Sequence, residues 1–178
     1  MPPYMAIPHY HLSKLPVTTK VALTGFSLAT LAAIAFSVFA VFAERTDLGS
    51  KGVKANFAGD ERVLKETGEK FDKMYAEPTK RALYDIVHPH SFMMPLLYFV
   101  LTHMMEMSYG GRNLKLAMYG AAFVSMMLVV FAPLLVAWKL STAPLALAGV
   151  TVMSLTFSYM AVVPPWQMWF AAKPKPPV

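Results

Sequence analysis

The chain has 178 residues, of which 56% are hydrophobic and 15% are charged, and its mean hydropathy is +0.46. This balance leaves either a membrane protein or an unusually apolar single domain. The formal net charge of +6 forms no stripe with interleaved aromatic residues, so nothing indicates nucleic-acid binding. The absence of cysteine excludes disulfides, thiolate zinc sites, iron–sulfur clusters and CxxCH haem attachment.

The first long apolar run covers residues 21–43 and contains 23 residues without a charge. Crossing the hydrocarbon layer of a bilayer takes about 20 residues. A secretion signal has a shorter apolar core, so we interpret this run as a retained membrane span. Residues 1–20, with four prolines in the first 16, are expected to extend from the membrane on the cytoplasmic side.

A long connection, residues 44–86, follows the first span. It carries nine basic and nine acidic residues. Apolar residues recur at helical spacing from about 60 to 77, Asp60 is placed to cap this helix, and Pro78 ends it. The connection is therefore expected to hold one amphipathic helix, which rests on its own bundle, on the membrane surface or on a partner.

Three further apolar runs, at residues 87–107, 116–138 and 143–163, are joined by short turns. Short turns make neighbouring helices antiparallel. Because unpaired backbone groups are costly in lipid, each run is expected to be a helix. The predicted fold class is all-α: an integral membrane protein with a four-transmembrane-helix bundle and a long extracytoplasmic loop.

The basic residues near the ends of the short loops indicate the orientation. Most of them lie on the side of both termini: Lys14, Lys20, Arg112, Lys115, Lys173 and Lys175. The positive-inside rule then places both termini in the cytoplasm of a bacterial-type inner membrane. Trp166 and Trp169 are expected to anchor the last span at the interface, and residues 164–178 to form a proline-rich cytoplasmic tail.

The second predicted span concentrates the groups that bind metals or protons. His88 and His90 lie at its outer end, and His103 and Glu106 lie near its inner end. His103 follows His88 by 15 residues, hence by about 22 Å along a helix. Ionisable groups at membrane depth mark ligand or proton sites by default. We therefore expect two polar layers, although histidines facing lipid headgroups would give the same pattern.

The segment HPHSF, followed by HMMEM, resembles the histidine-bearing helix of small b-type cytochrome membrane anchors of oxidoreductase complexes. That resemblance implies a haem b cofactor, with a quinone as a further ligand, at His103, His88, His90 and Glu106. Bis-histidine ligation takes one histidine from each of two helices, and the other predicted spans contain none. The remaining histidines, His9 and His11, lie on the cytoplasmic side, from which they could reach the inner layer.

Other ligands remain open at the same residues. A chlorophyll-type pigment needs one axial imidazole, which His103 could supply. Copper would suit His90 with Met94, or His103 with Met107, each pair being one turn apart. Glu106 and His103 could also relay a proton to a quinone.

Two functions follow from this interpretation. The first is an integral membrane subunit of a respiratory or photosynthetic electron-transfer complex, with other membrane subunits as partners and a periplasmic redox partner at the long loop. The second is a structural accessory subunit of a membrane complex without a cofactor. No enzyme signature such as a phosphate-binding glycine loop, HExxH or GxSxG occurs, so the chain is not expected to catalyse a reaction alone.

Overall fold

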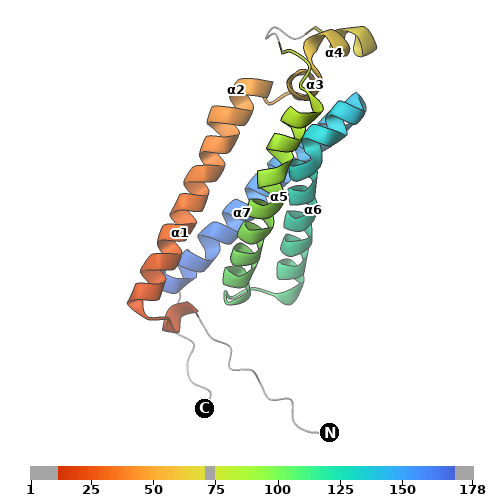
Figure 1. Cartoon of the computed structure of the whole chain (residues 1–178). Helices are drawn as coiled ribbons and strands as arrows, with labels where there is room; N and C mark the ends of the chain where they lie inside the picture. Colours follow the sequence, from red (N-terminus) through yellow and green to blue (C-terminus); the bar gives the residue numbers. More distant parts are fainter. Residues whose placement is uncertain (1–11, 71–74, 171–178) are drawn as a thin grey trace.

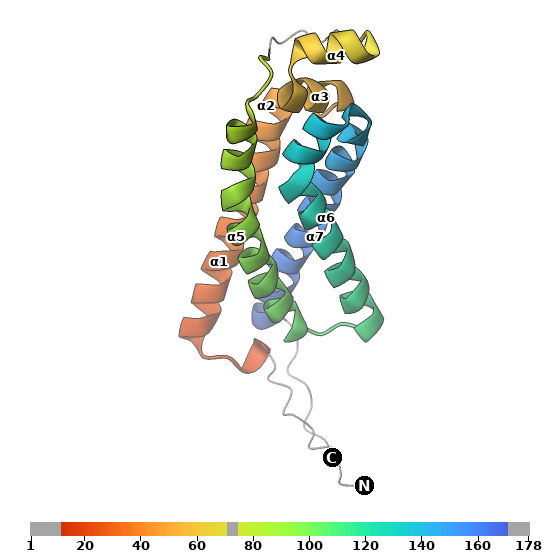
Figure 2. The same ribbon diagram turned by 45° about the vertical axis from the view of Figure 1, so that its right-hand side comes forward.

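The computed structural model of the chain describes residues 12–70 and 75–170, and within these ranges it contains helices and no strands (Figure 1). The predicted all-α fold class is confirmed. Long helices run up and down along one direction, and two short helices lie across one end of them (Figures 1 and 2). That end, which contains α3 (Ser50–Ala58) and α4 (Asp60–Thr67), is called the loop end below, and the opposite end the terminal end.

The first long helical stretch starts after a short 3₁₀ turn, η1 (Leu12–Lys14). It consists of α1 (Val17–Ala35), a π-helical segment η2 (Phe36–Phe42) and α2 (Ala43–Thr46). The predicted span at residues 21–43 lies inside it. The stretch ends where Asp47 and Leu48 both adopt positive φ, at 48° and 53°. Such left-handed conformations stop an α-helix and turn the chain across the loop end.

The predicted amphipathic helix at about 60–77 is shorter than expected. The connection holds α3 (Ser50–Ala58), which the sequence pattern did not predict, and α4 (Asp60–Thr67). The helix α4 ends at Gly68, which adopts φ 70°, a conformation that favours glycine at helix ends. Residues 71–74 of the predicted helix lie outside the described residues. The apolar side of this region faces the bundle, because Val63 packs with Ala58 and Leu140.

The sequence suggested that Asp60 caps α4, but this prediction is wrong, because Gly59 occupies the N-cap position and Asp60 is the first residue of the helix. The Asp60 Oδ2 instead accepts a hydrogen bond of 2.7 Å from the backbone N–H of Tyr75, and the Asp60 N–H donates to the Tyr75 carbonyl at 2.9 Å. These two bonds fasten the segment after α4 to the start of that helix.

Three long antiparallel helices complete the bundle: α5 (Lys80–Glu106), α6 (Arg112–Trp138) and α7 (Ala143–Phe170). A 3₁₀ turn, η3 (Leu140–Thr142), joins the last two. Thr79 caps α5, since its Oγ1 accepts the N–H of Ala82 at 3.2 Å. The helix then continues through Pro89 and Pro95.

The helix α7 extends beyond the predicted span at 143–163. It passes through Pro164 and Pro165 and ends at Phe170, so the first part of the predicted proline-rich tail is helical. Each proline removes one backbone donor. The neighbouring residues remain apolar, and an apolar surrounding favours the helix, in which the other backbone groups stay paired.

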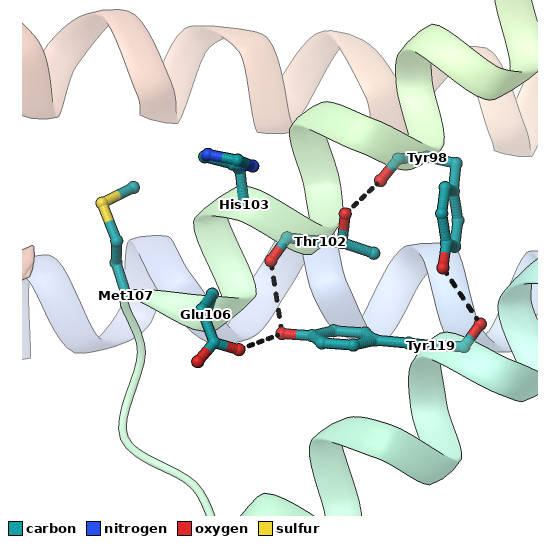
Figure 3. A pocket seen from close by; sticks show the side chains of 6 residues that line it. All are labelled: Tyr98, Thr102, His103, Glu106, Met107 and Tyr119. Carbon is teal, nitrogen blue, oxygen red and sulfur yellow. Dashed lines mark hydrogen bonds between the residues drawn. The ribbon is translucent and has the colours of Figure 1, made fainter.

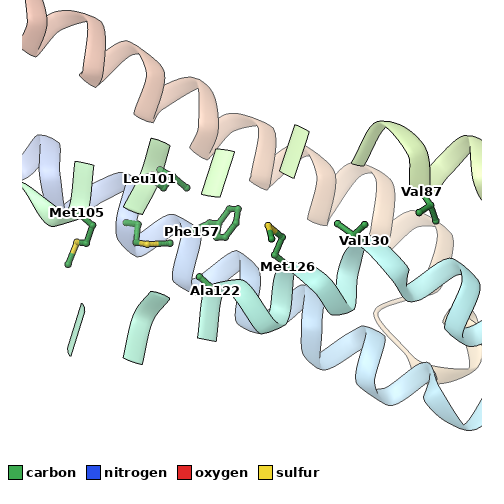
Figure 4. Close-up of a cluster of buried hydrophobic side chains, with 9 residues drawn as sticks. Val87, Leu101, Met105, Ala122, Met126, Val130 and Phe157 are labelled. Carbon is green, nitrogen blue, oxygen red and sulfur yellow. The ribbon is translucent and has the colours of Figure 1, made fainter. Parts of the chain in front are cut away.

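The hydrophobic core lies where α5, α6 and α7 meet (Figure 4). Its centre is formed by buried side chains from all three helices: Leu101, Met105, Ala122, Met126, Val130, Phe157 and Met160. The buried methionines therefore act as packing groups, which suits their flexible side chains.

Three helical stretches among the described residues are long and apolar enough to cross a membrane: Val17–Thr46, Arg112–Trp138 and Leu140–Phe170. The helix α5, which contains the predicted span at 87–107, is not one of them. It has the same length as α6 but a less apolar composition. The helices α1 and α7 meet at the terminal end, where the Lys20 Nζ donates a hydrogen bond of 3.0 Å to the Met168 carbonyl.

Candidate functional site at the terminal end of α5

A cleft of about 460 Å³ opens between α5 and α6 near the terminal end (Figure 3). Four of its six lining residues come from the last three turns of α5, and one from α6. The lining residues are Tyr98, Thr102, His103, Glu106, Met107 and Tyr119. Two of the residues predicted from the sequence, His103 and Glu106, thus line the same cleft.

Tyr119 connects the two helices that form the cleft. Its hydroxyl donates a hydrogen bond of 3.0 Å to the Glu106 Oε2 and lies 3.3 Å from the Thr102 carbonyl oxygen (Figure 3). In the opposite direction, the Tyr98 hydroxyl donates to the Tyr119 carbonyl at 3.4 Å. These contacts join α5 to α6 through polar groups beside an apolar core.

Glu106 also has a cationic neighbour. The Lys115 Nζ donates a hydrogen bond of 2.7 Å to the Glu106 carbonyl and lies 4.0 Å from its Oε2. The Lys115 side chain is 11% exposed, whereas the Glu106 side chain is 69% exposed. The carboxylate therefore faces the cleft opening, with a phenol and an ammonium group fixed behind it.

His103 lines the cleft without joining this network. Its ring lies apart from the Glu106 carboxylate in Figure 3 and packs against Phe99, with ring centroids 4.7 Å apart. The side chain is exposed, and no described residue forms a hydrogen bond with it. The expected pairing of His103 with Glu106 is therefore a shared cleft and not a direct contact.

The two outer histidines lie near the other end of α5. His88 packs edge-on against Phe92, with ring centroids 5.2 Å apart. The His90 Nδ1 lies 2.7 Å from the Ile86 carbonyl oxygen. A carbonyl oxygen can only accept, so Nδ1 carries a hydrogen and donates it to the Ile86 carbonyl. Nε2 is the ring nitrogen that this contact leaves for another partner.

The described residues contain no cluster of three or more His, Cys, Asp or Glu side chains that could hold a metal ion. His88, His90 and His103 all lie on α5, and the other long helices contain no histidine. His9 and His11 lie outside the described residues. Within the described part of this chain, a haem could therefore take one imidazole and not a pair from facing helices.

Sequence reasoning missed the residues that organise the cleft. Tyr119, Tyr98, Thr102 and Lys115 resemble the other scattered polar residues of long apolar helices. The sequence does give one indication for Tyr119 and Lys115. Both lie in the first two or three turns of α6, and a short turn joins this end of α6 to the end of α5 that contains Glu106. Only the packing of α5 on α6 selects them as partners of the carboxylate.

Comparison with known families gives one result. The family model Aq_1264_TM, described as a transmembrane helical domain, matches residues 47–175, which is more than half of the chain. The match begins directly after α2 and includes α3 to α7. Neither the comparison with curated proteins nor that with solved structures gave a match.

Proposed function

Because the chain belongs to the Aq_1264_TM family of transmembrane helical domains, and is a multi-pass membrane protein, we propose that it is an integral membrane subunit of an electron-transfer complex in which α5 supports a quinone site. In this proposal α5 crosses the membrane as a fourth span, with both termini in the cytoplasm of a bacterial-type inner membrane. Partner subunits supply or accept the electrons.

The observation that carries this proposal is the cleft at Glu106 and Tyr119. A quinone head is a flat ring whose two oxygens accept hydrogen bonds and exchange protons during reduction. The Tyr119 hydroxyl, held by α6, has one hydrogen, which it donates to Glu106 and would turn to a quinone oxygen when the ligand binds, and the exposed Glu106 carboxylate can exchange protons with water. Glu106 is the last residue of α5, and Tyr119 of α6 lies beside it, at the depth at which a quinone head would sit.

His103 adds a second titratable group to the cleft. An imidazole can both donate and accept a hydrogen bond. Its tilted contact with Phe99 provides a flat apolar surface beside the cleft. We assign it the role of positioning a ring and taking up a proton, while Glu106 and Tyr119 contact the quinone oxygens.

Haem b is the second cofactor to test at α5. His90 or His103 would supply one axial imidazole, and a partner subunit the other, since the other long helices lack histidine. A reduced-minus-oxidised absorption spectrum of the protein, purified alone and with its partners, checks this. Haem bands that disappear in His90→Ala or His103→Ala would make the chain a haem-binding subunit.

The quinone proposal is tested by titrating the purified protein in lipid nanodiscs with a short-chain quinone and measuring the heat of binding. We expect saturable binding that weakens about tenfold in Tyr119→Phe, because one hydrogen bond to the ligand is lost. Glu106→Gln is expected to weaken binding of the reduced form more than that of the oxidised form, since the amide cannot accept a proton.

Matched controls are available in the same chain. Tyr159→Phe removes a phenol from α7, and Glu61→Gln removes a carboxylate from the exposed first turn of α4. Both should bind the quinone as the wild type does. Equal binding by all four variants would remove the cleft from the proposal. Absence of both quinone and haem would leave the alternative function, a structural accessory subunit.

A further inference from the structure

A second and larger opening lies towards the loop end, away from the Glu106 cleft. It is a groove of about 1020 Å³ between the first helical stretch and α5, with α6 and α7 forming its floor. Asn56 and Phe57 of α3 line its loop end. Most lining side chains are apolar, among them Ala33, Leu97 and Phe157. Long apolar grooves of this kind fit the hydrocarbon chain of a ligand.

The length of the groove matches one lipid molecule. Its lining residues on α5 run from Asp85 to Val100. At the helical rise of about 1.5 Å per residue, this is about 22 Å. Half of a bilayer, headgroups included, measures about 20–22 Å. A phospholipid lying along α5 would therefore reach from the membrane surface to the bilayer centre.

The charged groups of the groove lie at its loop end. Arg45 and Asp85 line it there with Asn56 and His90, while the part further from the loop end is lined mostly by apolar side chains and by the hydroxyl residues Thr30, Ser37 and Ser154. Arg45 and Asp85 carry opposite charges and line the same end of the groove. A cation and an anion beside one apolar groove complement a head that carries both charges.

The π-helical segment η2 forms one wall of this groove. Phe36, Val41 and Phe42 line it, and the Ala43 N–H donates to the Val38 carbonyl, five residues earlier. This wider turn changes the direction of the side chains relative to an α-helix. Side chains of η2 therefore contribute to the apolar wall in an arrangement that a regular α-helix would not give.

We propose that this groove binds one zwitterionic phospholipid of the phosphatidylethanolamine class. The Arg45 guanidinium binds the phosphate in a charge-assisted, two-point contact. The Asp85 carboxylate binds the ammonium group, and Asn56 is in place to donate to an ester or phosphate oxygen. The acyl chains lie in the apolar part of the groove, against η2 and α5.

The experiment measures which lipid the protein retains. The full chain is purified in mild detergent, stripped of lipid, and incubated with phosphatidylethanolamine or with phosphatidylglycerol, and bound lipid is counted by native mass spectrometry. We expect one phosphatidylethanolamine per chain. Arg45→Gln should weaken its binding about tenfold, as for the loss of one charge-assisted contact. Asp85→Asn should remove the preference over phosphatidylglycerol, whose head has no ammonium group.

Two further variants keep the test decisive. Arg81→Gln removes a charge from the first turn of α5 outside the groove and should bind as the wild type does. Ala33→Phe fills the groove without changing a charge and should abolish binding even if a charge variant folds poorly. Equal retention of both lipids by the wild type, or equal retention by Arg45→Gln and Arg81→Gln, would overturn the proposal. Extraction of a quinone from this groove would also overturn it.

Discussion

The side-chain amide of Gln167 forms two hydrogen bonds with the backbone of Tyr109, one as acceptor and one as donor. Its Oε1 accepts the Tyr109 N–H at 2.5 Å, and its Nε2 donates to the Tyr109 carbonyl at 3.0 Å. Tyr109 lies in the turn between α5 and α6, and Gln167 lies in the last turns of α7. One side chain therefore ties the turn beside the Glu106 cleft to the third helix of the core.

Gln167→Ala is expected to lower the free energy of unfolding by about 1–2 kcal/mol, because two hydrogen bonds that hold the turn are lost. Gln167→Glu keeps the acceptor and loses the donor, so its effect should be about half as large. Thermal unfolding of the purified protein in detergent measures both. A stability unchanged in Gln167→Ala would mean that the turn needs no such support.

Gly52 allows α3 to pack directly on α2. A Cβ atom at this position would overlap the Thr46 carbonyl oxygen and lie 2.6 Å from the Thr46 Cα, which are backbone atoms that cannot move aside cheaply. We expect Gly52→Ala to destabilise the loop end by about 1–3 kcal/mol, as overpacking does in well-packed cores. Hydrogen exchange of the amides of α3 and α4 should report the loss locally.

Gly120→Ala is the matched control for this substitution. Gly120 lies inside α6, and nothing stands within 4 Å of a Cβ atom there. The change should therefore be neutral or stabilise by up to about 1 kcal/mol, since alanine is the better helix former. If both alanine variants behave alike, the close approach of α3 to α2 is not what fixes the loop end.

The ion pair between Lys54 and Glu69 predicts a pH dependence of the loop end. The Lys54 Nζ lies 2.8 Å from the Glu69 Oε2, and this hydrogen bond lowers the pKa of the Glu69 carboxyl from its ordinary value. A lowered pKa in the folded state means that the stabilisation is present above the unfolded-state pKa, about 4.3. It is lost as the pH falls through the lower pKa of the folded state.

The measurement compares wild type with Lys54→Met. Near neutral pH the variant should be less stable, and the difference should vanish in acid, where Glu69 is protonated in both states. Lys65→Met, in the last turn of α4, serves as a charge-matched control without an effect on Glu69. A stability difference that persists in acid would assign the effect to the packing of the lysine stem.

The absence of native cysteine makes the topology directly testable. In the proposed four-span arrangement, a cysteine at Glu61 faces outward and one at Asn113 faces the cytoplasm. A membrane-impermeant maleimide should label Glu61→Cys in intact cells and Asn113→Cys only after permeabilisation. If α5 does not cross the membrane, Asn113→Cys will also be labelled in intact cells, because only α1 would separate it from the N-terminus.

The candidate site was only partly predictable from the sequence. His103 and Glu106 are conspicuous on an apolar helix, and their spacing of three residues places them on one side of it. The sequence could not show that the Glu106 carboxylate turns to Tyr119 of α6 while the His103 ring packs on Phe99. Side-chain direction depends on which helix packs alongside, and that is a tertiary contact.

The same distinction holds for the groove and the loop end. Arg45 and Asp85 are separated by a connection of about 40 residues, in which left-handed backbone conformations at Asp47 and Gly68 end α2 and α4. A single sequence gives only a weak indication of such a conformation at Asp47. The predicted helix at 60–77 was therefore too long, and α3 was missed.

By itself, the sequence determined that this chain is helical and belongs in a membrane. Its long uncharged runs suit lipid, and in lipid such a run must form a helix, in which the backbone N–H and C=O groups pair with one another. It also placed the titratable groups on α5. The tertiary structure decided which residues from other segments lie near them: Tyr119 contacts Glu106, and Arg45 lines the same groove as Asp85. Apolar runs fix where a helix lies in a bilayer, whereas the pairing of helices depends on the fit of side chains from distant segments.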